Sequence, residues 1–322
     1  MSKRDSSIDV LKFVCAAFIV FLHTNWRYSE EVLPVTRFAV PCFFIISGYL
    51  LSDPERNRQE RLKHTFRRVL SITLWATLFF LIWDEGVQVV RTGSLTMPTA
   101  NDIVKWVLFN APPWGFHLWY LYAYLYVLLI FMWVNKYSLW RFLYWLTPLL
   151  LLTGLAFGTY GNLLCHGALP YVCLRSFIFM GLPYFTIGTL LKQHQRPQWT
   201  TQKQLLIGCI VLFALTTYLE RLLLVRTDTL AFQEYFLSTT PLAVSAFLLA
   251  LSFRKAPTSY GSQLGEKDSL YIYIIHPVFI LCGSALSDTL QWQEAYSYVA
   301  PFIVLAATIL SIKILRKMKL IL

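Results

Sequence analysis

Long apolar stretches, separated by short polar segments, recur along nearly the whole chain. A helix needs about 20 apolar residues to cross the hydrocarbon layer of a membrane, so the pattern predicts about ten membrane-spanning helices. Their predicted ranges are 8–26, 35–52, 69–90, 114–134, 139–157, 175–192, 204–221, 236–253, 269–287 and 297–315. Because little chain remains between them, we expect an all-α polytopic membrane helical bundle, with residues 1–322 forming a single membrane-embedded domain.

The composition supports this fold class. Hydrophobic residues make up 57% of the 322 residues and charged residues only 14%, whereas soluble domains carry roughly 25% charged residues. The first apolar stretch is expected to remain in the protein as a helix, and not to be cleaved as a signal peptide, because it is long and further spans follow it at once.

Lys and Arg residues are distributed unequally between the two sides of the predicted bundle. If the N-terminus lies inside, the inner segments hold Lys3, Arg4, Arg56, Arg58, Arg61, Lys63, Arg67, Arg68, Lys136, Arg141, Lys192, Arg196, Lys203, Arg254, Lys255, Lys267, Lys313, Arg316, Lys317 and Lys319. The outer segments hold only Arg27, Arg37, Arg91, Lys105, Arg175, Arg221 and Arg226. Cytoplasmic loops carry the excess of basic residues in membrane proteins, so both termini are predicted to be cytoplasmic and the number of spans even. This asymmetry also explains the net charge of +11, and we expect no nucleic-acid partner.

The cysteines and histidines give little support for a metal site, because the sequence contains neither a CxxC pair nor an HExxH motif. Four of the cysteines lie inside predicted spans, where they are expected to act as small apolar packing residues. Cys165 and Cys173 share one predicted outer loop, and the sequence leaves open whether they form a disulfide.

The first predicted span carries two ionisable side chains, Lys12 and His23. They are eleven residues apart. On an ideal helix their directions around the axis differ by only about 20°, and they lie about 16 Å apart along the axis. Lys12 lies near the inner boundary and either reaches the interface with Asp9 as its partner or has a functional role. An ionisable group as deep as His23 indicates a functional site, the alternative being a hydrogen bond between helices.

Several motifs resemble one family of membrane enzymes. The pattern D-x-x-K-x10-H, which ends at His23, is followed by "RFAVPCFFIISGYLLS" from Arg37 to Ser52, where Pro41 and the small pair Ser47 and Gly48 allow a kink and close helix contact. The other matching segments are "FHLWYLYAYLYVLL", "RSFIFMGLPYFTIGTLL" and "SLYIYIIHPVF". Together they resemble the integral membrane O-acyltransferases of the acyltransferase-3 family over nearly the whole chain. The length is similar to that of the small subgroup that consists of the membrane domain alone, such as the enterobacterial common antigen O-acetyltransferase.

The resemblance implies an activity and a place in the cell. It implies transfer of an acyl group, most simply acetyl, from cytoplasmic acyl-CoA to a hydroxyl of an extracytoplasmic or lipid-linked glycan, in the inner membrane of a bacterium. Acetyl-CoA would be a donor substrate, and no permanently bound cofactor is expected. Two other functions stay open from the residues alone: a multi-pass transporter, and an accessory protein of polysaccharide export.

Catalytic roles follow from the same resemblance. His23 matches the family's essential histidine, which acts either as the general base for direct attack or as a residue that is acylated in transit. Lys12 occupies a position where the family usually has arginine. Lysine keeps the positive charge but loses the planar fork that binds a phosphate through two hydrogen bonds.

The binding residues are assigned by position and by match to the family. Arg67 and Arg68 end a basic stretch, 53–68, that we expect to be an inner loop leading into a helix; they either hold the phosphates of coenzyme A or belong to the ordinary inner cluster of positive charge. Arg37 is predicted to lie at the outer end of its helix. There it either meets a glycan phosphate or a developing oxyanion, or anchors the helix at the interface.

Weaker candidates complete the substrate-binding set. His117, Trp119 and His276 match family positions and are predicted to contact substrate, although His276 also fits a structural role and Trp119 an interfacial one. Asp84 and Glu85 end the third predicted helix on the outer side. They either orient His23, or bind sugar hydroxyls, or simply form a solvated helix end.

Overall fold

The computed structural model describes residues 5–53, 57–194, 201–253 and 257–319. In these ranges every regular element is a helix and no strand occurs, which confirms the predicted all-α class. Six of the basic residues counted above lie outside the described residues: Lys3, Arg4, Arg56, Arg196, Arg254 and Lys255.

The chain forms two compact units. The first comprises Met1–Phe43, Arg196–Arg226 and Tyr235–Leu322, and the second comprises Phe44–Gln195 and Thr227–Glu234. The helix α3 (Ala39–Leu51) begins in the first unit and continues into the second.

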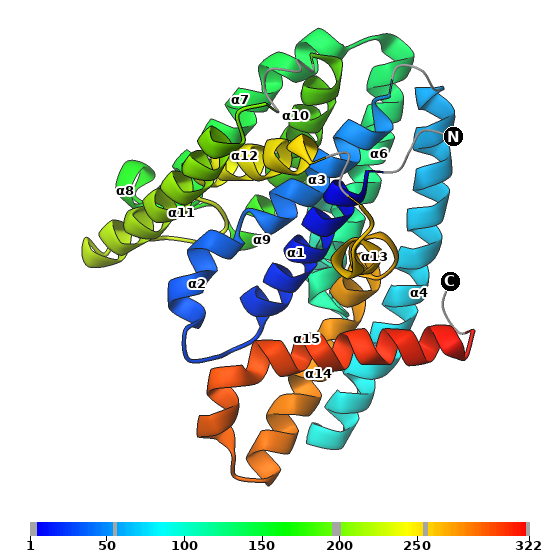
Figure 1. The fold of residues 1–322 in the computed structure, drawn as a ribbon. Helices are drawn as coiled ribbons and strands as arrows, with labels where there is room; N and C mark the ends of the chain where they lie inside the picture. Colours follow the sequence, from blue (N-terminus) through cyan, green and yellow to red (C-terminus); the bar gives the residue numbers. More distant parts are fainter. Residues whose placement is uncertain (1–4, 54–56, 195–200, 254–256, 320–322) are drawn as a thin grey trace. The chain divides into compact units, whose positions relative to one another are not determined.

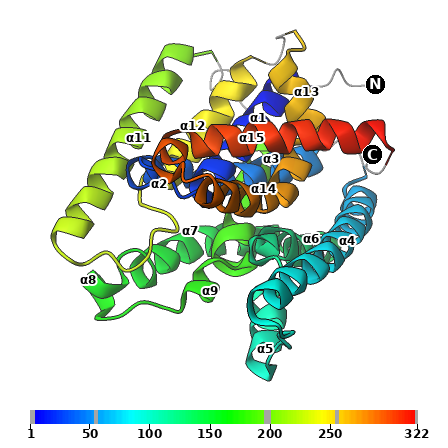
Figure 2. The same ribbon diagram turned by 90° about the horizontal axis from the view of Figure 1, so that it is seen from below.

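The first unit is organised around α1. Its elements are α1 (Ser6–His23), α2 (Ser29–Thr36), α11 (Lys203–Arg226), α12 (Thr239–Ser252), α13 (Tyr260–Lys267), α14 (Ser269–Thr289) and α15 (Gln293–Lys317). Helix α13 packs against α1, and α15 crosses α14 (Figure 1). Figure 2 shows α11 beside α12. Ala16 and Val20 of α1 are fully buried in a core with Ile272 of α14 and Val304 of α15.

Gly265 explains how closely α13 approaches α1. A Cβ atom at this position would collide with the backbone carbonyl of Asp9. Because backbone atoms of a packed helix cannot move aside as a flexible side chain can, only glycine permits this crossing.

The second unit contains the remaining helices. They are α4 (Arg58–Thr92), α5 (Ala100–Phe109), η1 (Phe116–Leu118), α6 (Trp119–Tyr137), α7 (Trp140–Phe157), α8 (Gly161–Cys165), α9 (Tyr171–Leu174), the π-helical turn η2 (Phe177–Gly181) and α10 (Leu182–Gln193). Helix α4 packs on α6, and α10 packs on α7. In this unit Gly48 of α3 and Gly188 of α10 lie against each other's helix, because added Cβ atoms would collide with the carbonyls of Phe185 and Ile45 respectively. The predicted close helix contact at Gly48 is therefore confirmed.

The predicted spans correspond well to the observed helices. Within the described ranges, nine helical segments are long and apolar enough to cross a membrane. The predicted span 236–253 corresponds to α12, whose 14 residues rise about 21 Å, less than the roughly 30 Å of a hydrocarbon core. The predicted cytoplasmic position of both termini stays a prediction.

The predicted span 35–52 is interrupted near its start. Helix α2 ends at Thr36, and α3 begins at Ala39 after a turn at Arg37 and Phe38. Pro41 lacks the backbone N–H that would bond to the carbonyl of Arg37 in a continuous helix. The break therefore lies four residues before the proline that predicted a kink.

Helix α4 begins earlier than predicted. The segment 58–68, expected to be a loop, is helical, and that part of the prediction was wrong. The Asn57 side chain accepts a hydrogen bond from the Glu60 backbone N–H and so caps the helix. Hydrophobicity locates the edge of the membrane, whereas a segment rich in Arg, Gln, Glu and Leu continues as a helix beyond that edge.

Candidate functional site

The structure brings His23 and His276 together in the first unit. His23 is the last residue of α1 and half-buried, and His276 lies in α14 and is fully buried. Their ring centroids are 5.4 Å apart, and the ring planes are inclined by 32°. Two histidines that are 253 positions apart in the chain thus share one site, a relationship that spacing within a helix did not predict.

The orientation of the His276 ring follows from its neighbour Pro277. Proline has no N–H, so the carbonyl of Tyr273, four residues earlier, loses its helical donor. His276 Nδ1 donates to this oxygen at 2.8 Å and to the Ile272 oxygen at 3.1 Å. Because both partners are acceptors, Nδ1 carries the hydrogen, and in the neutral ring Nε2 carries the lone pair.

Lys12 has the partner that the sequence predicted. Its Nζ atom lies 2.8 Å from Asp9 Oδ1, one turn earlier on α1. The Asp9 side chain is 5% exposed and that of Lys12 is 21% exposed, so the ion pair is largely shielded from solvent. On the face of α1 between Lys12 and His23, Ala16 and Ile19 are buried.

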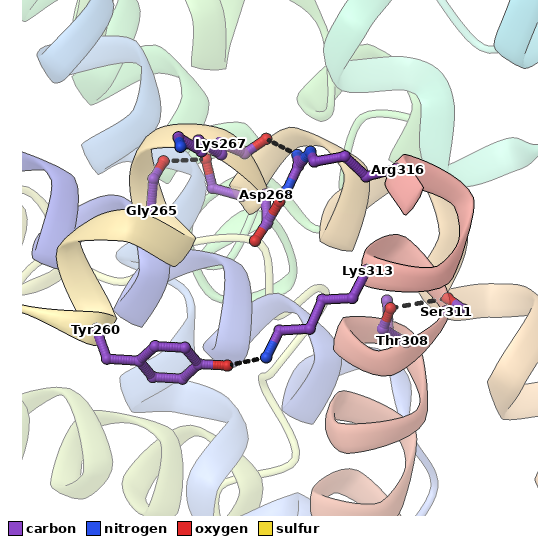
Figure 3. A network of polar contacts seen from close by, with 9 residues as sticks. Tyr260, Gly265, Lys267, Asp268, Thr308, Ser311, Lys313 and Arg316 are labelled. Carbon is purple, nitrogen blue, oxygen red and sulfur yellow. Dashed lines mark hydrogen bonds and ion pairs between the residues drawn. The ribbon is translucent and has the colours of Figure 1, made fainter. Parts of the chain in front are cut away.

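A polar network joins α13, α14 and the last turns of α15 in the first unit (Figure 3). Arg316 Nη1 forms an ion pair with Asp268 at 2.6 Å, and its Nη2 donates to the carbonyl oxygen of Lys267. Lys313 donates to the Tyr260 hydroxyl at 2.6 Å. These contacts hold the last turns of α15 against the α13–α14 junction.

Arg37 lies in the turn between α2 and α3 and is half-buried. The next residue, Phe38, packs edge-on against Phe18 of α1, with ring centroids 5.6 Å apart. This turn is thereby attached to α1 five residues before His23.

The structure places His117 and Trp119 in the packed interior of the second unit. His117, in the η1 turn, is 7% exposed, and its ring meets the Phe80 ring at 4.6 Å. Trp119, the first residue of α6, is 6% exposed. Their assignment to substrate binding stays a prediction.

A buried ion pair in the second unit was missed by the sequence reasoning. Arg175 Nε lies 2.6 Å from Glu234 Oε2, with side chains 9% and 4% exposed. The guanidinium also lies 4.3 Å from the centre of the Tyr171 ring. Asn110 donates from its side chain to the Arg175 carbonyl at 3.0 Å. Arg175 was visible as an outer cation, but nothing in the sequence linked it to an acid 59 residues later.

Asp84 and Glu85 line a groove of about 480 Å³ in the second unit, together with Gln88, Asp102, Lys105, Trp114 and Phe116. Gly115 N–H donates to Asp84 at 2.7 Å. Glu85 accepts from the Trp114 indole at 2.9 Å and from the Thr96 N–H at 2.8 Å. The two carboxylates therefore anchor the loops that form the groove.

Arg67 and Arg68 are both exposed on α4, about two and a half turns after its first residue. Their position inside a long helix differs from the expected helix start. The proposed contact with coenzyme A phosphates stays a prediction.

The described residues hold no group of three or more His, Cys, Asp and Glu side chains placed to bind a metal ion. Cys165 and Cys173 are both free thiols in the structure.

Comparison with known proteins identifies the family. A family model described as an acyltransferase domain, that of the acyltransferase-3 family, matches residues 5–316. The chain belongs to the acyltransferase-3 family. The match covers nearly the whole chain, and the part of the chain that the structure describes contains nine helical segments long and apolar enough to cross a membrane.

One curated relative is similar over most of this chain. It is the serine/alanine racemase of Enterococcus gallinarum, 25% identical over 314 residues, which are 89% of this chain. The chain spans only 43% of the length of that relative. No solved structure matches the chain.

Proposed function

We propose that this acyltransferase moves an acyl group, most simply acetyl, from cytoplasmic acyl-CoA to a hydroxyl of an extracytoplasmic or lipid-linked cell-surface glycan. The site of action would be the inner membrane of a bacterium. The observation that carries the proposal is the contact of the half-buried His23 with the fully buried His276 among apolar helices, in a chain of this family. A histidine in such surroundings is the side chain best suited to remove a proton from a hydroxyl near neutral pH.

His23 is the proposed general base. It takes the proton from the acceptor hydroxyl while the hydroxyl oxygen attacks the thioester carbonyl, and the C–S bond then breaks. The proton held on His23 passes to the departing sulfur, so the products are the glycan ester and free coenzyme A. His276, with its Nδ1–H held by two carbonyl oxygens, is proposed to position the His23 ring and contact the substrate beside it.

The cationic residues have proposed roles at the two ends of the reaction. Lys12 supplies a positive charge on the same helical stripe as His23, about 16 Å away. Arg67 and Arg68 are proposed to bind the donor's phosphates, which their exposure permits. Arg37 is proposed to bind a phosphate of a lipid-linked acceptor or the oxyanion formed during attack.

The acceptor is proposed to be a glycan because the loops of the second unit offer suitable chemistry. The groove beside Asp84 combines carboxylates, an amide and a lysine with the aromatic rings of Trp114 and Phe116. Sugars present hydroxyls to polar groups and C–H faces to aromatic rings, so this mixed lining supports a glycan over an apolar acceptor. His117 directly follows Phe116 of the groove lining, and Trp119 is the first residue of α6.

The continuous family match over residues 5–316 also supports our proposal that the whole chain is one acyltransferase domain. Racemisation is not proposed, because the relative of that name is more than twice as long as the matched part.

The test uses purified protein in lipid vesicles, labelled acetyl-CoA and crude envelope glycan. We expect label to appear as ester on the glycan with wild type. His23→Ala should lower this rate by about 10²- to 10⁴-fold, the usual contribution of a positioned base. His194→Ala is the matched control, because His194 is exposed at the end of α10.

Three outcomes distinguish the alternatives. Unchanged esterification in His23→Ala would overturn the assignment of the base. Movement of unmodified glycan across the vesicle membrane without consumption of acetyl-CoA would favour a transporter. Label trapped on His23 in the absence of glycan would favour the acylated-histidine route over direct attack.

A further inference from the structure

An apolar groove of about 520 Å³ lies within the first unit, on α1, α11 and α12. Val10, Val14 and Phe18 of α1 form one wall, and Ala214 of α11 and Ala246 of α12 form the other. Of its lining residues, only Ser6, Ser7 and Ser259 carry polar side chains, and all three belong to the same end of the groove, near the start of α1 and α13.

This groove is separate from the candidate catalytic site. Val14 and His23 are nine residues apart on α1, which on an ideal helix is two and a half turns and places them on opposite faces. Lys12 and His23 share the face that packs against α13 and α14, whereas Val10, Val14 and Phe18 face the groove. One helix therefore carries the ionisable stripe on one side and an apolar channel wall on the other.

The length of the groove suits a single lipid chain. From Ser6 to Phe18 the lining residues of α1 rise about 18 Å, close to the roughly 15 Å of hydrocarbon in one leaflet. An acyl chain that enters at the Ser6 end would thus be covered along the depth of its leaflet.

A cation stands at the polar end. The Lys203 ammonium lies 4.1 Å from the centre of the Phe253 ring, and Phe253 lines the groove. Lys203 is also the first residue of the 24-residue helix α11, where the helix dipole favours a bound anion. By the distribution of basic residues this end is predicted to face the cytoplasm, where the leaflet carries anionic lipids.

We propose that the groove binds one acyl chain of an anionic phospholipid from the cytoplasmic leaflet, with its phosphate against Lys203 and the first turn of α11. The inference is independent of the proposed acyl transfer. The polar end favours a phospholipid over a lipid-linked glycan, because the glycan acceptor is expected on the opposite side of the membrane. The apolar walls require a chain, so a free phosphate would not occupy the site.

The test measures lipid that purified protein retains after incubation with phosphatidylglycerol or phosphatidylcholine of identical acyl chains, read by native mass spectrometry. Wild type should retain phosphatidylglycerol in preference to phosphatidylcholine. Lys203→Gln should lower that preference about fivefold, the usual worth of one basic residue at a membrane surface. Lys136→Gln is the matched control, because Lys136 also lies over an aromatic ring, that of Tyr137 at 5.0 Å, but belongs to the second unit and not to the unit that contains the groove.

A second pair of variants tests the chain-binding walls. Ala246→Trp should fill the groove and reduce retention of both lipids, whereas Gly208→Trp on open surface of α11 should not. If Ala246→Trp does not fold, Ala214→Phe makes the same test from α11, the neighbouring helix of the groove lining. Equal retention of the two lipids by wild type, or unchanged retention in the filled variants, would overturn the proposal.

Discussion

The Nδ1 atom of His276 donates to the carbonyl oxygen of Tyr273 at 2.8 Å, the oxygen that Pro277 leaves without a helical donor. The helix defect at the proline and the orientation of the buried histidine are thus one structural feature. The His276 ring in turn lies 5.4 Å from that of His23. The backbone of α14 therefore sets the surroundings of the proposed base.

Replacing Pro277 by alanine should loosen this arrangement. The new N–H at position 277 would bond to the Tyr273 carbonyl and compete with the imidazole, so the His276 ring would lose one of its two acceptors. We expect kcat to fall by up to about 10-fold with KM for acetyl-CoA unchanged, because small misplacements near the reacting atoms lower the rate without weakening donor binding.

Pro148→Ala is the control for this prediction. Pro148 also lies inside a helix, α7, but its side chain is exposed and the residue directly before it is a threonine, not a histidine. The measurement is the steady-state kinetics of both variants. Equal kcat values for Pro277→Ala and wild type would show that catalysis does not depend on the hydrogen bond from His276 to the Tyr273 carbonyl.

The ion pair of Lys12 and Asp9 predicts different results for stability and for activity. Lys12→Met leaves the buried Asp9 carboxylate without its 2.8 Å partner and should destabilise the protein. The double variant Asp9→Asn with Lys12→Met removes both charges and should recover most of that stability while activity stays low, if the positive charge serves the reaction. Lys12→Arg should keep both properties.

Thermal unfolding in detergent and the acetyl-transfer assay measure the two properties separately. Full activity in the double variant would mean that Lys12 is a structural anchor only.

Gly265 should tolerate no side chain. A Cβ at this position overlaps the Asp9 carbonyl, so Gly265→Ala should force α13 away from α1 at a cost of about 1–3 kcal/mol. Gly261→Ala in the same helix meets nothing closer than the edge of the Phe13 ring at 3.8 Å. It should be neutral or stabilise by up to about 1 kcal/mol, because alanine restricts the unfolded chain. A comparable loss in both variants, measured by thermal unfolding, would contradict the close-approach argument.

The buried pair of Arg175 and Glu234 should contribute strongly to the stability of the second unit. Glu234→Gln leaves the Arg175 charge buried and should cost about 3–5 kcal/mol. Asp102→Asn is the comparison, because its partner Lys105 lies 4.0 Å away and both side chains are exposed; such surface pairs are worth about 1 kcal/mol or less. The prediction fails if chemical denaturation gives the two variants similar stabilities.

Much of the fold followed from the sequence. The apolar periodicity located the membrane helices because crossing a bilayer requires a length of apolar chain that little else in a protein needs. The pairing of Lys12 with Asp9 was also predictable, because residues three apart on a helix are neighbours regardless of tertiary structure. The motifs that surround His23 and Arg37 identified the family that the match over residues 5–316 establishes.

Helix ends were less predictable. Hydrophobicity placed the start of the third span at residue 69, but the helix begins at Arg58. Its start is decided by the Asn57 cap and by the helix propensity of the residues beyond the membrane edge. Likewise the break before α3 lies at Arg37 and Phe38, since a missing proline N–H affects the carbonyl four residues earlier.

Only the tertiary structure decided which distant residues meet. The sequence singled out His23 and His276 separately, but their 5.4 Å ring contact depends on how α1 and α14 cross. Glu234 carried no signal at all until folding placed it on Arg175. Local pattern determines each helix through interactions within a few residues, whereas these contacts join positions 59 and 253 residues apart, which only the packing of whole helices can bring together.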